Sequence, residues 1–360
     1  GGDDGIVHQL LQVRRLQGER RVESEAHDRD EDDARGEVAV AKQRGPQERL
    51  ARGEGMHQED IERRGGDDQF RHDLLGAEPV ELLAPVEQHL QRRDADAQAH
   101  EACARLNITT RFVSVIGDDL YGQQMLKHAQ TIHLHMQDCL IMPQTPTSTY
   151  LSILDESRDL AVSINHMDTI DFLTVEDIKA RRSLIEHAQL CVLDTNLSEA
   201  VLEYLLTGFP NTIFFVDPVS GSKAQKIKPY IHAIHTLKPN LLEAKVLSSN
   251  SEDSISLEEM AKSLKSQRTF ISLGSQGVFI IDGNKHIRFQ SPPIDVVNAT
   301  GAGDAFMAGL VYAYLKGLNI EETVWIAMAA SRLALSSKDT INPNFSEQLL
   351  LKTMEEIKHV

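Results

Sequence analysis

Long apolar runs, paired cysteines and an excess of positive charge are all absent from this 360-residue sequence. No apolar run approaches the roughly 20 residues that a membrane-spanning helix needs, and the first residues, Gly1 to Asp4, do not resemble a signal peptide. The formal net charge is −17, so the chain repels phosphate backbones and anionic lipid. We therefore expect neither nucleic acid nor a membrane as a partner.

Cysteines are few and stand far apart in the sequence. The three residues, Cys103, Cys139 and Cys191, form neither a disulfide framework nor a metal-spaced pair. Disulfides are rare in reducing compartments, where free thiols persist. This cysteine usage favours a cytoplasmic location.

Other residue types are scarce only in the first part of the chain. Residues 1–106 contain one lysine, one serine and one aromatic residue, and no threonine or asparagine, whereas residues 107–360 contain all of these throughout. The first part has little apolar surface to offset the entropy of ordering. We expect it to be disordered or loosely helical, with local helices over 74–104, or a mis-joined translation attached to a genuine domain at 107–360.

From residue 107 onward, strand and helix patterns alternate. Between 188 and 273 the alternation predicts parallel strands joined by crossover helices, hence a layered α/β sheet with ligands bound beyond the carboxyl ends of its strands. A hairpin is expected over 150–164. We expect strands at 112–116, 190–193, 212–216, 234–237, 269–273, 278–281 and 286–289, and helices at 119–130 (capped by Asp118), 174–187, 198–206, from 240, and at 257–266, 303–316, 321–335 and 345–357.

The strongest motif is Asn-Ala-Thr-Gly-Ala-Gly-Asp at 298–304, followed directly by apolar residues at helical spacing. Gly301 and Gly303 let the backbone approach a ligand closely. The amides of 301–304 then lie at a helix N-terminus, which favours anions, and Asp304 adds a carboxylate beside them. This combination suits phosphoryl transfer, in which the amides stabilise phosphate charge and the carboxylate accepts a proton from a hydroxyl. The alternative is a glycine-rich turn with Asp304 as an ordinary helix N-cap.

A second motif runs from Lys238 to Glu243, after a predicted strand and at the start of a helix. Asn240 and Glu243 are three residues apart and share one helix face. That placement suits contacts with the hydration shell of Mg²⁺ and with phosphate oxygens. The same spacing also fits a capping box, so both interpretations stay open.

Two further segments end predicted strands. The loop Ser272 to Val278, which contains Gly274 and Gly277, is either a hairpin turn or a loop against which a nucleotide packs. The segment Val216-Asp217-Pro218 is ambiguous by itself.

The order and spacing of these four segments resemble the ribokinase-like (PfkB) family of carbohydrate and nucleoside kinases, over about 111–345. The resemblance implies a layered α/β/α fold with a small β lid, and ATP and Mg²⁺ as cofactors. It implies that Asp304 is the catalytic base and that Gly301, Ala302 and Gly303 form the anion hole.

The resemblance also implies roles for residues outside this loop. Asn240 and Glu243 would serve the Mg²⁺–phosphate group, with Glu243 contacting Mg²⁺ through water. Family members have Asp-Thr where this chain has Asn298 and Ala299, which weakens the expectation of a monovalent-cation site. The remaining implied residues are Ser272, Gly274, Gly277 and Asn342 at the nucleotide, and Thr149, Ser152 and Asn165 in a lid over the acceptor. Asn342 also fits an ordinary turn, and the three lid residues also fit exposed strand positions.

Within the family, the likeness implies a C-nucleoside acceptor such as pseudouridine, phosphorylated at its 5′-hydroxyl. The stretches that carry it are 115–122, 147–152, 164–168 and 235–240. Another nucleoside, or a sugar such as ribose, is the alternative acceptor. A homodimer is compatible with this resemblance.

Family members begin with a strand, an acceptor-binding aspartate and a Gly-Gly…Asn segment. Nothing in residues 1–106 resembles these features. We therefore expect the N-terminal strands of the fold to be missing and the acceptor pocket to be incomplete. The chain is then either an active kinase or a catalytically impaired nucleotide-binding protein.

Overall fold

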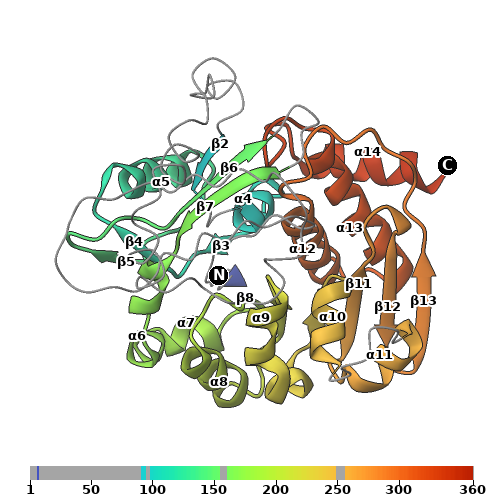
Figure 1. Cartoon of the computed structure of the whole chain (residues 1–360), viewed down its shortest axis with the longest axis horizontal. Helices are drawn as coiled ribbons and strands as arrows, with labels where there is room; N and C mark the ends of the chain where they lie inside the picture. The colour runs from blue at the N-terminus through green and yellow to red at the C-terminus, as the bar shows by residue number, and fades with distance from the viewer. Residues whose placement is uncertain (1–5, 8–90, 95–97, 155–159, 249–255, 360) are drawn as a thin grey trace, which may run out of the picture. The chain divides into compact units, whose positions relative to one another are not determined.

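The computed structural model describes residues 6–7, 91–94, 98–154, 160–248 and 256–359 (Figure 1). They fall into two compact units. The larger unit contains the described residues within Gly1–Glu19, Arg93–Tyr150 and Asn165–Val360, and the smaller one contains those within Arg20–Arg92 and Leu151–Ile164. Among the described residues, no helix is both long and apolar enough to span a bilayer.

A mixed six-stranded sheet in the order β13-β12-β11-β10-β9-β8 forms the centre of the larger unit (Figure 1). Strands β8 to β11 pair with one another in parallel, whereas β12 pairs antiparallel with β11 and β13 pairs antiparallel with β12. Strands β8 and β9 are apolar and almost wholly buried, as expected for parallel strands covered on both faces. The strands are β8 (Cys191–Asp194), β9 (Phe214–Asp217), β10 (Thr236–Leu237), β11 (Arg268–Ser272), β12 (Val278–Asp282) and β13 (Lys285–Phe289).

Helices cover both faces of this sheet, as the two apolar cores show. On β8, Val192 belongs to a core with helices α4, α12 and α13, whereas its neighbour Leu193 belongs to a core with α8, α10 and α11. Side chains that alternate along a strand therefore enter opposite cores, and the layered α/β/α expectation is confirmed. The helices are α4 (Gln98–Arg105), α5 (Leu120–Thr131), α6 (Val175–Ala180), α7 (Arg182–Glu186), α8 (Glu199–Gly208), α9 (Gly221–Ala224), α10 (Leu241–Leu247), α11 (Leu257–Ser263), α12 (Ala302–Leu315), α13 (Ile320–Leu335) and α14 (Glu347–Lys358), with 3₁₀ helices η2 (Asp168–Phe172), η3 (Gln225–Ala233) and η4 (Gly274–Gln276).

Smaller sheets complete the described strands. The expected hairpin is present, since β6 (Thr149–Leu154) and β7 (Leu160–His166) are neighbours in a three-stranded sheet with β2 (Gln91–Asp94). Strands β4 (Val115–Gly117) and β5 (Leu140–Met142) pair in parallel. Strands β1 (Ile6–Val7) and β3 (Thr110–Arg111) pair in the same way.

The region 110–122 differs from the sequence prediction in two details. Of the strand expected at 112–116, only residues 115–116 are strand, as part of β4, while β3 lies just before the expected range. Helix α5 is capped by Asp119, not by Asp118, because the Asp119 carboxylate accepts a hydrogen bond from the amide of Gly122. The Asp118 carboxylate instead accepts one from the amide of Gln144.

Helix α4 lies in the segment that the sequence predicts to be a loose extension. Its residues Ala99, Ala102 and Cys103 are buried in the same core as α12 and α13. Burial raises the pKa of the Cys103 thiol, which keeps it protonated. These eight residues therefore pack as part of the folded core, while the domain boundary at residue 106 stays a prediction.

Candidate functional site

Charged and polar residues gather at the carboxyl ends of neighbouring strands. Asp194 and Asp217 lie directly opposite each other at the ends of β8 and β9. Lys238 follows β10, and a backbone bridge joins Asn240 to Ser272 at the end of β11. Parallel pairing thus places three of the four motifs at one edge of the sheet, where ligands bind in folds of this kind.

The Lys238 ammonium group is buried at the centre of this edge. It forms an ion pair with Asp217, with 2.9 Å between Nζ and Oδ2, and its side chain is 1% exposed. Burial lowers the pKa of Lys238, but the carboxylates of Asp217, Glu243 and Asp304 raise it more, so the net shift is upward. The cation is therefore charged at neutral pH, and its charge interactions link the Asp304 motif to the segments that contain Asp217 and Glu243.

Asp304 lies in the first turn of α12. Gly301 is the N-cap of this helix, with φ 90°, so the alternative in which Asp304 is the N-cap is wrong. A Cβ on Gly301 would lie 2.1 Å from the carbonyl oxygen of Thr340, so the turn needs glycine. The helix therefore begins at Ala302, and the partly buried Asp304 is the third residue of its first turn, where the backbone amides have no partner within the helix.

Hydrogen bonds hold the loop before α12 in place. The side-chain carbonyl of Asn298 accepts a hydrogen bond from the Thr300 amide at 2.9 Å, and its amide group donates to the Lys338 carbonyl at 3.2 Å. The Ser331 hydroxyl donates to the Ala302 carbonyl at 2.7 Å. These contacts fix the first turn of α12 against α13 and fix the loop before it against the segment that follows α13.

Asn240 and Glu243 form a complete capping box at the start of α10. The Asn240 side chain accepts a hydrogen bond from the Glu243 amide, and both Glu243 oxygens accept hydrogen bonds from Asn240. The Glu243 residue is 2% exposed. The capping interpretation is thus confirmed, and a contact with the hydration shell of Mg²⁺ stays a prediction.

The Ser272–Gly277 loop is the turn of the antiparallel β11–β12 hairpin. Its Ser272 amide donates to the Pro239 carbonyl at 2.9 Å, which joins it to the Asn240 motif. Gly277 has φ 92°, and a Cβ there would lie 2.0 Å from the carbonyl oxygen of Phe289. The hairpin interpretation is confirmed, while nucleotide contact at Ser272, Gly274 and Gly277 stays a prediction.

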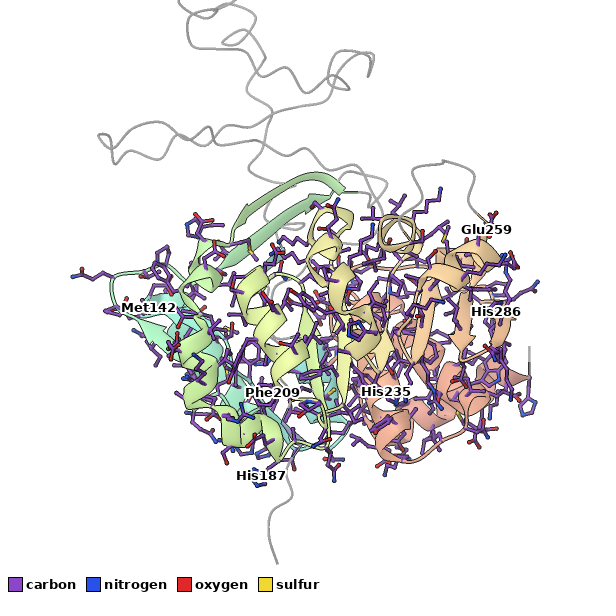
Figure 2. All side chains as sticks on the ribbon, turned by 90° about the horizontal axis from the view of Figure 1, so that it is seen from below. Met142, His187, Phe209, His235, Glu259 and His286 are labelled. Carbon is purple, nitrogen blue, oxygen red and sulfur yellow. The ribbon has the colours of Figure 1, made fainter. Side chains whose placement is uncertain are left out.

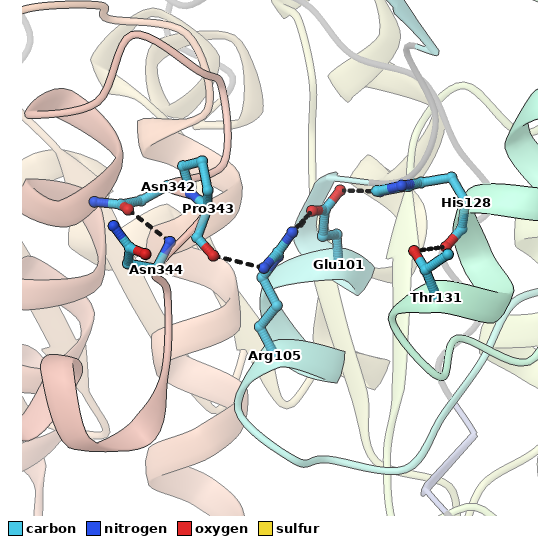
Figure 3. Close-up of polar contacts among 7 residues, drawn as sticks. All are labelled: Glu101, Arg105, His128, Thr131, Asn342, Pro343 and Asn344. Atoms are coloured by element: carbon cyan, nitrogen blue, oxygen red, sulfur yellow. Dashed lines mark hydrogen bonds and ion pairs between the residues drawn. The ribbon is translucent and has the colours of Figure 1, made fainter.

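The loop with Asn342 is connected to α4 (Figure 3). The Asn342 side chain donates a hydrogen bond to the Leu333 carbonyl at 3.2 Å and accepts one from the Asn344 amide at 2.9 Å, so Asn342 stabilises a turn. Its contact with a nucleotide stays a prediction. Arg105 donates to the Pro343 carbonyl at 2.8 Å and pairs with Glu101 at 2.7 Å. The loop position therefore depends on α4.

The predicted acceptor residues lie on the paired strands β6 and β7. Thr149 is the first residue of β6, Ser152 lies within it, and Asn165 is next to the last residue of β7. The side chains of Ser152 and Asn165 lie outside the described part of the structure. Acceptor binding by these three residues stays a prediction.

Two charged residues at this edge were missed by the sequence prediction. Asp194 is 6% exposed and accepts a hydrogen bond from the Asn196 amide at 2.7 Å, while Lys223 donates to the Asn196 side chain. Burial raises the pKa of Asp194 well above its usual range, against the opposing effects of Asn196 and Lys223. A charged residue that ends an apolar strand was the available signal for Asp194, whereas the fold alone places Lys223 beside it.

Known proteins resemble this chain in sequence and in overall fold. Residues 99–347 match the family model described as pfkB family carbohydrate kinase. The chain is 36% identical over 248 residues to the pseudouridine kinase of Escherichia coli K12, covering 68% of this chain and 79% of that protein. It is 31% identical over 250 residues to YeiI, an uncharacterized sugar kinase of the same organism, covering 68% of each. Ribokinase from Thermotoga maritima has a similar structure, with a TM-score of 0.62 at 21% identity over 73% of this chain and 86% of that one.

Proposed function

Because the chain belongs to the pfkB family of carbohydrate kinases, we propose that it phosphorylates pseudouridine at the 5′-hydroxyl with ATP as the donor. The similarity to a pseudouridine kinase supports this acceptor. The observation that carries the proposed chemistry is the position of Asp304 in the first turn of α12, close to the amides that follow Gly301. This geometry pairs a proton acceptor with an anion-binding helix terminus.

In the proposed reaction, the Asp304 carboxylate accepts the proton of the acceptor hydroxyl. The hydroxyl oxygen forms a bond to the γ-phosphorus as the bond between that phosphorus and the ADP oxygen breaks. The amides of Gly301, Ala302 and Gly303 stabilise the charge on the transferred phosphoryl group. The N-terminal end of the 14-residue helix α12 adds its dipole to this stabilisation.

The described residues contain no cluster of three side chains that could ligate a metal, so Mg²⁺, which prefers oxygen ligands and retains several waters, would be held here largely through water. Glu243 would act through water, since its two oxygens already accept hydrogen bonds from Asn240. When bound, Mg²⁺ would neutralise phosphate charge. The capping box fixes the Glu243 carboxylate in one orientation before nucleotide binds.

The nucleotide would lie along the loop with Ser272, Gly274 and Gly277 and reach the turn at Asn342. Apart from its two chain neighbours, no described residue has an atom within 4 Å of a Cβ built on Gly274, so this part of the loop is open to a ligand. Thr149, Ser152 and Asn165 would contact the acceptor from β6 and β7.

A panel of acceptors tests the proposal. We expect ATP-dependent phosphorylation of pseudouridine, measured as ADP release and as formation of the 5′-phosphate, at a kcat/KM well above that for uridine, adenosine or ribose. Faster phosphorylation of another member of the panel would keep the chemistry and overturn the acceptor. ATP binding without transfer to any acceptor would overturn the kinase proposal and favour a nucleotide-binding protein.

A further inference from the structure

The buried Lys238 has no assigned part in the reaction proposed above. Lysine is rarely buried completely unless it is paired, and Lys238 forms its ion pair with Asp217 at the end of β9. Two further carboxylates, Glu243 in the first turn of α10 and Asp304 in the first turn of α12, lie close enough to raise its pKa. One fixed cation is thus surrounded by carboxylates from three different elements.

An ion pair of this kind is weak evidence for a purely structural role. Removing both charges from water is costly, so a buried pair often stabilises a fold no better than apolar side chains of similar volume. The location of the pair is more informative. Asp304 and Glu243 lie where the proposed reaction places the phosphates of ATP, and three carboxylates at that place would repel a polyphosphate.

We propose that Lys238 is a positioning residue whose fixed positive charge offsets Asp217, Glu243 and Asp304 and so lets the terminal phosphates of a nucleotide approach the start of α12. This inference rests on the proposed function. Lys238 itself does not touch the ligand, because its side chain is 1% exposed and its ammonium group is held by Asp217. It acts through its charge, because a charge buried in the protein is screened far less than a charge in solvent.

Isothermal titration with ATP and with AMP, in the absence of acceptor, tests this inference. AMP ends at the α-phosphate and so lacks the phosphates that the charge of Lys238 attracts. We expect Lys238→Met to weaken ATP binding at least tenfold and AMP binding less than twofold. Lys228→Met is the matched control, since this partly buried lysine donates to the Val246 carbonyl near the other end of α10, and it should leave both affinities unchanged.

Asp217→Asn separates charge from structural support. It breaks the same ion pair as Lys238→Met but removes a negative charge, so we expect ATP to bind at least as tightly as in the wild type. If the pair only fastened β9 to the segment after β10, both variants would weaken ATP binding by a similar factor, which would overturn the inference. Equal weakening of ATP and AMP binding in Lys238→Met would overturn it as well.

A double variant keeps the test valid if Lys238→Met alone does not fold. Lys238→Met combined with Asp217→Asn leaves neither charge of the pair without its partner, which is much less costly than leaving one. We expect it to bind ATP at least tenfold more weakly than Asp217→Asn does. Equal ATP affinity of these two variants would overturn the inference, whereas a wild-type chain that binds no ATP would instead contradict the proposed function from which the inference starts.

Discussion

Two glycines in one loop, Gly274 and Gly277, have left-handed backbones but different surroundings. A Cβ on Gly277 would overlap the Phe289 carbonyl at 2.0 Å, whereas a Cβ on Gly274 meets no described atom within 4 Å beyond its chain neighbours. We expect Gly274→Ala to lower the free energy of unfolding by about 1 kcal/mol, the cost of a left-handed alanine. Gly277→Ala adds backbone overlap and should cost about 3 kcal/mol or more. Urea titration of both variants measures the difference, and equal losses would contradict this view of the hairpin.

The distance between two residues along the chain decides whether the sequence alone could predict that they lie together. Asp304 and Gly301 stand in one contiguous motif, so their proximity follows from a few residues of local chain. Lys238 and Asp217 come from segments about 20 residues apart, and only the pairing of β9 with β10 brings them together. Their ion pair could not be derived from either segment alone.

Among helices and strands, the start of α5 is held by an unusually well-bonded cap. The Asp119 carboxylate accepts hydrogen bonds from the Gly122 amide and from both the amide and the hydroxyl of Thr147. Burial raises the pKa of Asp119, but these hydrogen bonds lower it more, so the net shift is downward. A carboxyl group with a lowered pKa stabilises the fold above its ordinary pKa of 3.8 and loses this contribution as pH falls further.

We therefore expect Asp119→Ala to destabilise the protein by about 2 kcal/mol at pH 7 through loss of the cap and its charge-assisted hydrogen bonds. The difference from wild type should shrink below pH 3.8, which urea midpoints at pH 7 and pH 3.5 would show. Asp118→Ala is the matched control, with an expected cost below about 1 kcal/mol, because Asp118 is exposed and accepts the Gln144 amide. Equal costs for the two variants would show that the cap is not at Asp119.

His235 lies just before β10 (Figure 2), and its ring connects the sheet to α12 through aromatic contacts. Its ring stacks on Phe215 with centroids 5.5 Å apart and lies edge-on to Tyr314 at 5.1 Å. Burial, with a smaller effect of Arg268, lowers the pKa of His235 to about 4. The unfolded chain therefore binds the proton more readily than the folded chain does.

The contribution of His235 to the stability of the fold should accordingly be fully present above pH 6.5 and be lost as the pH decreases toward 4. The variant His235→Phe keeps the ring contacts but cannot bind the proton. Between these pH values we expect its free energy of unfolding to fall by about 1 kcal/mol less than that of the wild type, a figure that allows for solvent screening of a partly exposed group. Thermal melts at pH 7, 5.5 and 4.5 would test this. Identical pH dependence of the two proteins would exclude a contribution from His235.

For the molecule as a whole, the alternating elements after residue 107 were predictable because apolar periodicity and helix caps agree with each other. Thr174, Ser198, Asn240 and Ser346 all cap the helices that follow them. Two features were not predictable. The packing of α4 depends on contacts with helices two hundred residues later in the chain, and the division of 110–117 into β3 and β4 depends on pairing with separate segments.

The central claim is that Asp304 removes the proton from the acceptor hydroxyl. Phosphoryl transfer by Asp304→Asn, measured as ADP release with pseudouridine, tests it most directly when ATP affinity is titrated in parallel. We predict that transfer falls at least a thousandfold while ATP binds within about threefold of wild type, since asparagine keeps the size of the side chain but accepts no proton. Transfer at the wild-type rate in this variant would contradict the account.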